Sequence, residues 1–139
     1  MPVLTRLFIK TALVYFVTAL LIGLILAANA LFTLPPVMAA LNPIYFHLFM
    51  VGWITQLIIG VAYWMFPKFT REQPRGSERL ASMTYLCLNV GLVLRFIAEP
   101  MLSFQTAKWW GWLVALSALL QWLSGLAFIV NTWPRVKER

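Results

Sequence analysis

Six polar or ionisable residues interrupt the apolar stretches of this sequence, and they are where its chemistry could lie: Asn29, His47, Asn89, Arg95, Glu99 and Gln121. Burying such groups among apolar side chains is costly, so each needs a partner or a function. His47 is the only histidine in the chain. A neutral imidazole is a common protein ligand for haem iron. The alternative is a histidine that only forms a hydrogen bond to a neighbouring helix.

Arg95 and Glu99 are four residues apart, so on a helix they share one face and can form an ion pair. Alternatively, Arg95 binds a carboxylate of a cofactor, because a guanidinium group recognises carboxylates through two parallel hydrogen bonds. Haem carries two carboxylates, its propionates. We therefore predict a haem b site in which His47 is the iron ligand and Arg95 holds a propionate. Further candidates are Asn29 and Tyr45 and, as a possible second iron ligand, Met38, Met50 or Met101.

The elements that must position these residues are membrane-spanning helices. Of the 139 residues, 62% are hydrophobic, and the mean hydropathy is +0.83. A soluble domain of this size has too little interior to bury so much apolar surface. Four stretches reach the roughly 20 residues that a span requires. We predict one all-α domain over residues 1–139, an integral membrane four-helix bundle with spans at about 11–32, 44–66, 81–101 and 110–133.

Prolines between these stretches are expected to end the helices, since proline lacks an N–H and clashes with the preceding turn. Pro67 follows the second stretch and Pro100 closes the third. Cations lie before the first span, between the second and third, and after the fourth: Arg6, Lys10, Lys68, Arg71, Arg75, Arg79, Arg135, Lys137 and Arg139.

Positively charged flanks stay on the cytoplasmic side of a membrane. We therefore expect both termini in the cytoplasm, in a bacterial-type inner membrane. The net charge of +7 is explained by these flanks and by anionic lipid headgroups rather than by nucleic-acid binding. This orientation places Asn29, His47, Arg95 and Glu99 in the outer third of the bundle.

The second span is expected to have two different sides. Gly52, Gln56 and Gly60 recur every four residues, so they share a face on which a neighbouring helix can approach closely. At 100° per residue, His47 points away from that face. We expect the histidine side to meet a cofactor or another subunit.

Hydrolytic chemistry finds no support. The chain has no aspartate, which excludes a Ser–His–Asp triad, and it has no glycine-rich phosphate loop. Its single cysteine, Cys87, cannot form an intrachain disulfide. A small multidrug-type transporter would require an acidic residue within the first span, and residues 11–32 contain none.

The stretch from His47 through Gly60 to Pro67, Lys68 and Phe69 resembles the second transmembrane helix of haem–copper oxidase subunit I. It is also similar to nitric-oxide-response membrane haem proteins. The shared pattern is a histidine near the outer end, a mid-helix glycine, and an aromatic-rich exit into proline and a basic residue. The resemblance implies that His47 is an axial ligand of a low-spin haem.

The chain departs from those oxidases in having far fewer spans and only one histidine. It therefore cannot form a copper site or reduce oxygen alone. We expect electron transfer, or haem or gas sensing. The alternative is a non-catalytic subunit or assembly factor of a respiratory complex. A homodimer could share one haem between two copies of His47, or each chain could hold its own.

Overall fold

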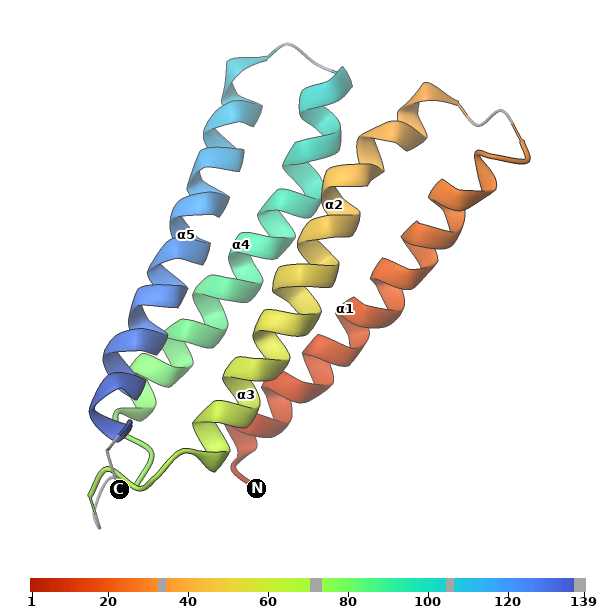
Figure 1. Cartoon of the computed structure of the whole chain (residues 1–139). Coiled ribbons are helices and arrows are strands. Elements are labelled where there is room, and N and C mark those ends of the chain that lie inside the picture. The colour runs from red at the N-terminus through yellow and green to blue at the C-terminus, as the bar shows by residue number, and fades with distance from the viewer. Residues whose placement is uncertain (33–34, 71–73, 105–106, 137–139) are drawn as a thin grey trace.

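The computed structural model covers residues 1–139 and describes all of them except 33–34, 71–73, 105–106 and 137–139. The described residues form helices and no strands (Figure 1). The bounds are α1 Val3–Ala28, η1 Pro36–Leu41, α2 Asn42–His47, η2 Leu48–Thr55, α3 Gln56–Met65, α4 Glu78–Phe104, α5 Lys108–Thr132 and η3 Trp133–Arg135. Because η1, α2, η2 and α3 run into one another, the second span is continuous from Met38 to Met65. Four helices are thus long and apolar enough to cross a membrane, which confirms the predicted all-α fold.

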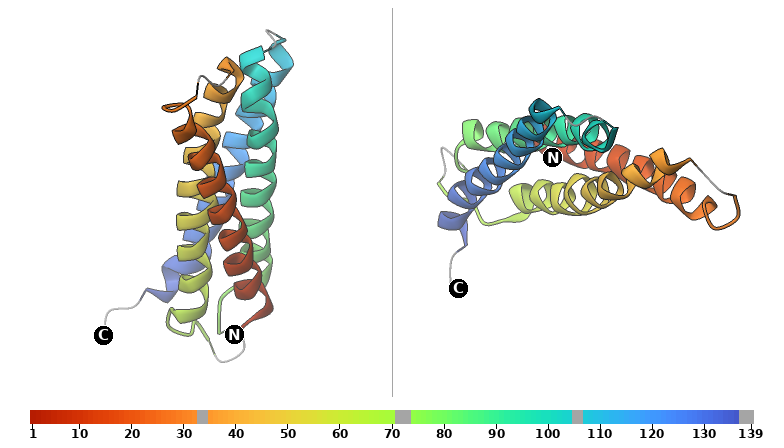
Figure 2. Two further views of the ribbon diagram at one scale, coloured as in Figure 1. Left: turned by 90° about the vertical axis from the view of Figure 1, so that its right-hand side faces the viewer. Right: turned by 90° about the horizontal axis from the view of Figure 1, so that it is seen from above.

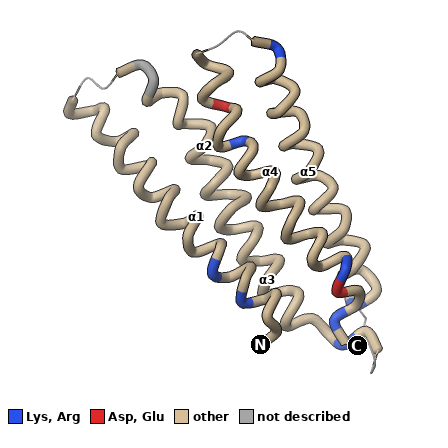
Figure 3. Tube along the Cα trace, turned by 180° about the vertical axis from the view of Figure 1, so that it is seen from behind, with Lys and Arg blue, Asp and Glu red and all other residues tan. Residues whose placement is uncertain are grey.

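In Figure 1 the helices follow one another in the order α5, α4, α2–η2–α3 and α1. The view from above in Figure 2 shows that they do not form a flat row, and α1 also contacts α4 through the Thr11–Tyr85 and Tyr15–Asn89 hydrogen bonds. The start of α1, the end of α3, the start of α4 and η3 lie at one end, which we call the terminal end; the other is the distal end. The cations of the described residues are concentrated at the terminal end (Figure 3). This agrees with the charge pattern from which we predicted cytoplasmic termini. Arg71, Lys137 and Arg139, which belong to that pattern, lie outside the described residues.

Many large apolar side chains stay exposed on the outward faces of the helices, among them Val17, Leu24 and Trp112. Water would disfavour such a surface, whereas lipid tails solvate it. The apolar helices therefore indicate contact with a lipid bilayer.

Proline does not end the third span as expected. The helix α4 continues through Pro100 to Phe104. Proline removes only one backbone hydrogen bond, and helices that cross membranes tolerate this loss. By contrast, Pro43 lies in the first turn of α2, where its missing N–H costs nothing.

The glycine face of the second span packs against α1, as predicted. A Cβ atom added at Gly52 would lie 2.9 Å from the ring of Tyr15, and one at Gly60 would lie 2.7 Å from Cβ of Phe8. Between them, Gln56 is fully buried and its Nε2 donates to the Phe8 carbonyl at 3.3 Å. This face is therefore occupied within the chain itself.

Replacing Gly60 by alanine should push α1 away from α3, because the methyl group would overlap a side-chain atom fixed close to the helix backbone. We expect a loss of about 1–3 kcal/mol in unfolding free energy, measured by denaturant titration in mixed micelles. Gly125→Ala is the matched control, since nothing lies within 4 Å of a Cβ there. Equal stability of the two variants would contradict the close α1–α3 contact.

The eight residues that follow His47 form a π-helix, which the hydrophobic pattern did not predict. In a π-helix each backbone hydrogen bond spans five residues instead of four. The Thr55 hydroxyl likewise donates to the Met50 carbonyl, five residues earlier. Inserted π turns occur frequently at functional sites. Here the π-helix directly adjoins the histidine.

At the terminal end, Arg135 connects α5 to α3, and this residue is only 1% exposed. Its guanidinium donates to the carbonyls of Tyr63, Phe66 and Pro67 at 2.9–3.1 Å. These carbonyls lie at the end of α3, where intrahelical partners run out. The charge pattern predicts Arg135 only as a flanking cation, but its hydrogen bonds connect the end of α5 to the end of α3.

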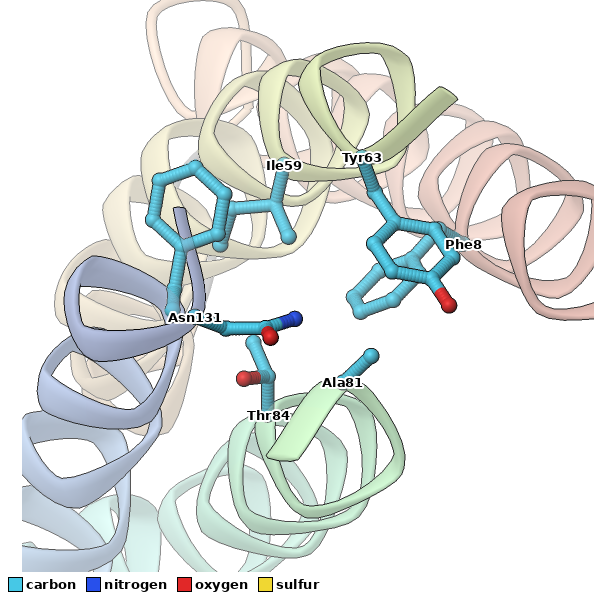
Figure 4. Close-up of a pocket in the computed structure, with 7 residues that line it drawn as sticks. Phe8, Ile59, Tyr63, Ala81, Thr84 and Asn131 are labelled. Atoms are coloured by element: carbon cyan, nitrogen blue, oxygen red, sulfur yellow. The ribbon is translucent and has the colours of Figure 1, made fainter. Parts of the chain in front are cut away.

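All four long helices also border a small cavity of about 10 Å³ near this end (Figure 4). This is close to the smallest volume that holds a water molecule. The Asn131 amide points toward it, while its Oδ1 accepts a hydrogen bond from the Ser77 N–H. The cavity is thus a packing gap in the core, far smaller than a cofactor site.

Candidate functional site

His47 ends α2 on the side that faces α4, and both of its ring nitrogens have partners. Nδ1 lies 2.8 Å from the carbonyl of Pro43, one turn earlier in the same helix. Nε2 lies 3.1 Å from Nη1 of Arg95. Arginine can only donate, so Nε2 must accept, and Nδ1 must carry the proton that it gives to Pro43. The two contacts are satisfied together by the tautomer with the proton on Nδ1 and the lone pair on Nε2.

Arg95 is the centre of the site. The same Nη1 that reaches His47 also donates to Oε1 of Glu99 at 2.9 Å, one turn further along α4. Nε donates to Oγ of Ser117 on α5 at 3.2 Å. The Arg95 and Glu99 side chains are only 13% and 14% exposed, whereas that of His47 is 31% exposed. Of the two roles left open for Arg95, the structure shows the ion pair with Glu99, and the role as a propionate partner stays a prediction.

Glu99 keeps one oxygen without a hydrogen bond. Its Oε2 is buried and has no hydrogen-bond partner among the described residues, although Nδ1 of His47 lies 3.7 Å away. A buried carboxylate oxygen in this state retains unused capacity to accept a hydrogen bond. The site can therefore take up one more donor.

Sequence reasoning missed the part that α5 contributes. Ser117 is fully buried; its Oγ donates to the Gly91 carbonyl at 2.7 Å and accepts from Nε2 of Gln121 at 3.2 Å. The only signal was the four-residue spacing of Ser117 and Gln121, which places both on one helix face. Serine is too common in membrane helices for that spacing to single it out.

The other predicted site residues lie elsewhere. Tyr45 faces α1, where its ring is the nearest neighbour of Gly23, and it stacks on Phe49. Asn29 is an exposed C-cap of α1, and Met50 is 51% exposed. The structure thus brings His47 and Arg95 into contact, while the cofactor roles of Asn29, Tyr45 and Met50 stay predictions.

The tautomer of His47 can be tested directly. Because the chain has one histidine, ¹⁵N-histidine labelling gives a single imidazole spectrum. In haem-free protein we expect a protonated Nδ1 and an unprotonated Nε2 that accepts a hydrogen bond, since Pro43 and Arg95 impose these roles. Arg95→Ala should move the Nε2 resonance downfield. A spectrum with the proton on Nε2 would contradict this geometry.

A comparison with known protein families identifies the family of this chain. Residues 40–109, about half of it, match the family described as Cytochrome C and Quinol oxidase polypeptide I. The chain belongs to this family. It is a small relative of haem–copper oxidase subunit I, as the second-span pattern indicated. No curated protein and no solved structure matches it significantly. The family match covers His47, Arg95 and Glu99, and it ends before Ser117.

The residues present fit one axial bond to a haem. An imidazole whose Nδ1–H is held by a backbone carbonyl has the tautomer and orientation of metal-bound histidines. The neighbouring guanidinium suits a propionate. Among the described residues, no three His, Cys, Asp or Glu side chains gather in a metal-binding group. A haem does not need such a group, because the porphyrin supplies four ligands itself.

Proposed function

We propose that this chain is a haem b-binding membrane protein in which Nε2 of His47 binds the iron. The observation that supports the proposal best is the hydrogen bond from Nδ1–H of His47 to the Pro43 carbonyl, which puts the lone pair of the imidazole on Nε2, the atom that would bind the iron. Bound haem would supply one-electron chemistry or a binding place for a diatomic gas. The role is therefore electron transfer, or haem or gas sensing.

The protein's own residues hold the imidazole and balance charge. Pro43 orients the ring of His47. Nε2 has a single lone pair, which accepts from Arg95 in this structure, so His47 could hold iron only with that contact broken. The Nη1 donor of Arg95 would then be free for a haem propionate, with Glu99 and Ser117 holding the guanidinium near the site.

Oxygen reduction by this chain alone does not follow from family membership. The chain has one histidine, and additional imidazole ligands would have to come from another chain. We propose a homodimer that shares a haem through two copies of His47, in a bacterial-type cytoplasmic membrane with cytoplasmic termini. A ratio of one haem to two chains would support sharing; one haem per chain would contradict it.

The alternative role, a non-catalytic subunit or assembly factor of a respiratory complex, depended on two features as contacts for another subunit: the Gly52–Gly60 face and the many aromatic side chains. Aromatic side chains such as Trp112 and Trp122 stay exposed, but the glycine face no longer supports this role. That face is filled by Phe8 and Tyr15 of α1. Co-purification with large respiratory subunits in the absence of haem would restore this alternative.

The optical spectrum of the purified protein tests the proposal. We expect a Soret band, and a b-type reduced-minus-oxidised difference spectrum. Arg95→Ala should retain less haem because the propionate partner is lost. Wild-type protein that stays colourless after purification and after incubation with haem would refute the proposal.

A further inference from the structure

We infer that Ser117 of α5 is a positioning residue: it holds the Arg95 guanidinium in contact with His47. For its consequence at a bound haem, this inference rests on the proposed function. The contact itself can be tested without haem. Ser117 lies outside the part of the chain that matches the oxidase family.

The argument begins with the freedom of the Arg95 side chain. An arginine side chain has many rotamers, so fixing one conformation requires several simultaneous contacts. Glu99 is on the same helix and anchors only Nη1, which is also the atom that reaches His47. Ser117 accepts from Nε, at the root of the guanidinium, and comes from a different helix. It therefore sets the direction in which the guanidinium plane points.

Ser117 is itself held in place. Its hydroxyl proton goes to the Gly91 carbonyl, which leaves the oxygen lone pairs facing Arg95 and Gln121. At Gly91, an added Cβ would lie 3.0 Å from the Ser117 carbonyl oxygen, so α4 and α5 are in close contact at this level. The position of α5 can therefore affect His47, through the contact of Ser117 with Arg95 and that of Arg95 with His47.

The chain offers a matched control seven residues further along α5. Ser124 is equally buried and donates to the Thr84 carbonyl of α4 at 2.8 Å, as Ser117 donates to Gly91 at 2.7 Å. Each serine thus supplies one hydrogen bond between the same two helices. Only Ser117 also contacts Arg95. Ser117→Ala and Ser124→Ala lose the same kind of helix contact; Ser117→Ala also loses the bonds from Arg95 and from Gln121, and only the first of these leads to His47.

The first experiment is ¹⁵N NMR of the labelled His47 in the haem-free full chain, in lipid nanodiscs. Losing the hydrogen bond from Arg95 should move the Nε2 resonance downfield. We expect this shift in Ser117→Ala, in the direction seen for Arg95→Ala, and none in Ser124→Ala. An unchanged resonance in Ser117→Ala, or equal shifts in both serine variants, would overturn the inference whether or not the protein binds haem.

The second experiment is a redox titration of the haem-loaded variants. A fixed positive charge beside the iron favours the reduced form. A guanidinium released from Ser117 can move away, so the ratio of reduced to oxidised haem at a given potential should fall by roughly threefold or more. Ser124→Ala should titrate like wild type. Identical titrations of the two serine variants would show that Ser117 does not act on the cofactor, whereas absence of a Soret band in wild type would refute the haem proposal alone.

Discussion

Purified His47→Ala protein is expected to lack the Soret band. His47 is the only imidazole in the chain, so the variant has no substitute nitrogen ligand for the iron. Loss of an outer partner of a metal ligand already weakens metal binding about 10- to 100-fold, and loss of the ligand itself should weaken haem binding by more than roughly 100-fold. Titration of haem into the purified variant, followed by absorbance, measures the change.

Two controls separate ligand loss from misfolding. Added imidazole should restore part of the Soret band, because it can occupy the space that the ring leaves. Met50→Leu should keep the full band if this exposed methionine is not an axial ligand. An unchanged band in His47→Ala would show that the haem is held elsewhere, and the proposed site would have to be abandoned.

Several features of the fold and the site were predictable because they depend on properties that each residue carries alone. Hydropathy predicted four spans, and an even number brings the start of α1 and the end of α5 to one end of the bundle. The four-residue steps from Gly52 through Gln56 to Gly60 predicted a face for close helix contact. Depth in the membrane placed His47 and Arg95 at one level, and the structure brings them within 3.1 Å.

The features that were missed depend on neighbours rather than on single residues. Ser117 is an ordinary small residue until Arg95 comes to lie beside it. The π-helix after His47 has no compositional signal, since its residues are as apolar as those of an α-helix. Pro100 lies within α4 because a long membrane helix can lose one backbone hydrogen bond. A sequence pattern does not show which neighbouring groups will contact a residue or make up for a lost hydrogen bond.

The role of Arg135 also depends on its neighbours and could not be predicted from the sequence. Its replacement is expected to have the largest effect on stability. Arg135→Ala would leave the carbonyls of Tyr63, Phe66 and Pro67 without their donor. Hydrogen bonds from a charged group are worth about 1.5–3 kcal/mol each, and part of this is recovered when water reaches the carbonyls. We expect a loss of roughly 3 kcal/mol in unfolding free energy, measured by denaturant titration in mixed micelles.

Two further variants test whether this loss comes from the guanidinium itself. Arg79→Ala removes an exposed cation at the same end and should cost under about 0.5 kcal/mol. Arg135→Lys should be intermediate, because an ammonium group keeps the charge but cannot reproduce the planar array of donors. Equal stabilities of Arg135→Ala and Arg79→Ala would mean that Arg135 acts only as a flanking charge.

The Arg135 variant also separates the stability of the fold from the geometry of the site. Arg135 joins α5 to α3 at the terminal end, whereas Ser117 connects α5 to His47 nearer the distal end. Folded Arg135→Ala protein should therefore keep the wild-type Nε2 resonance of His47 despite its lower stability. A shifted resonance would show that the contacts of Arg135 at the terminal end affect the contact of Ser117 with Arg95, and so help to set the position of Arg95.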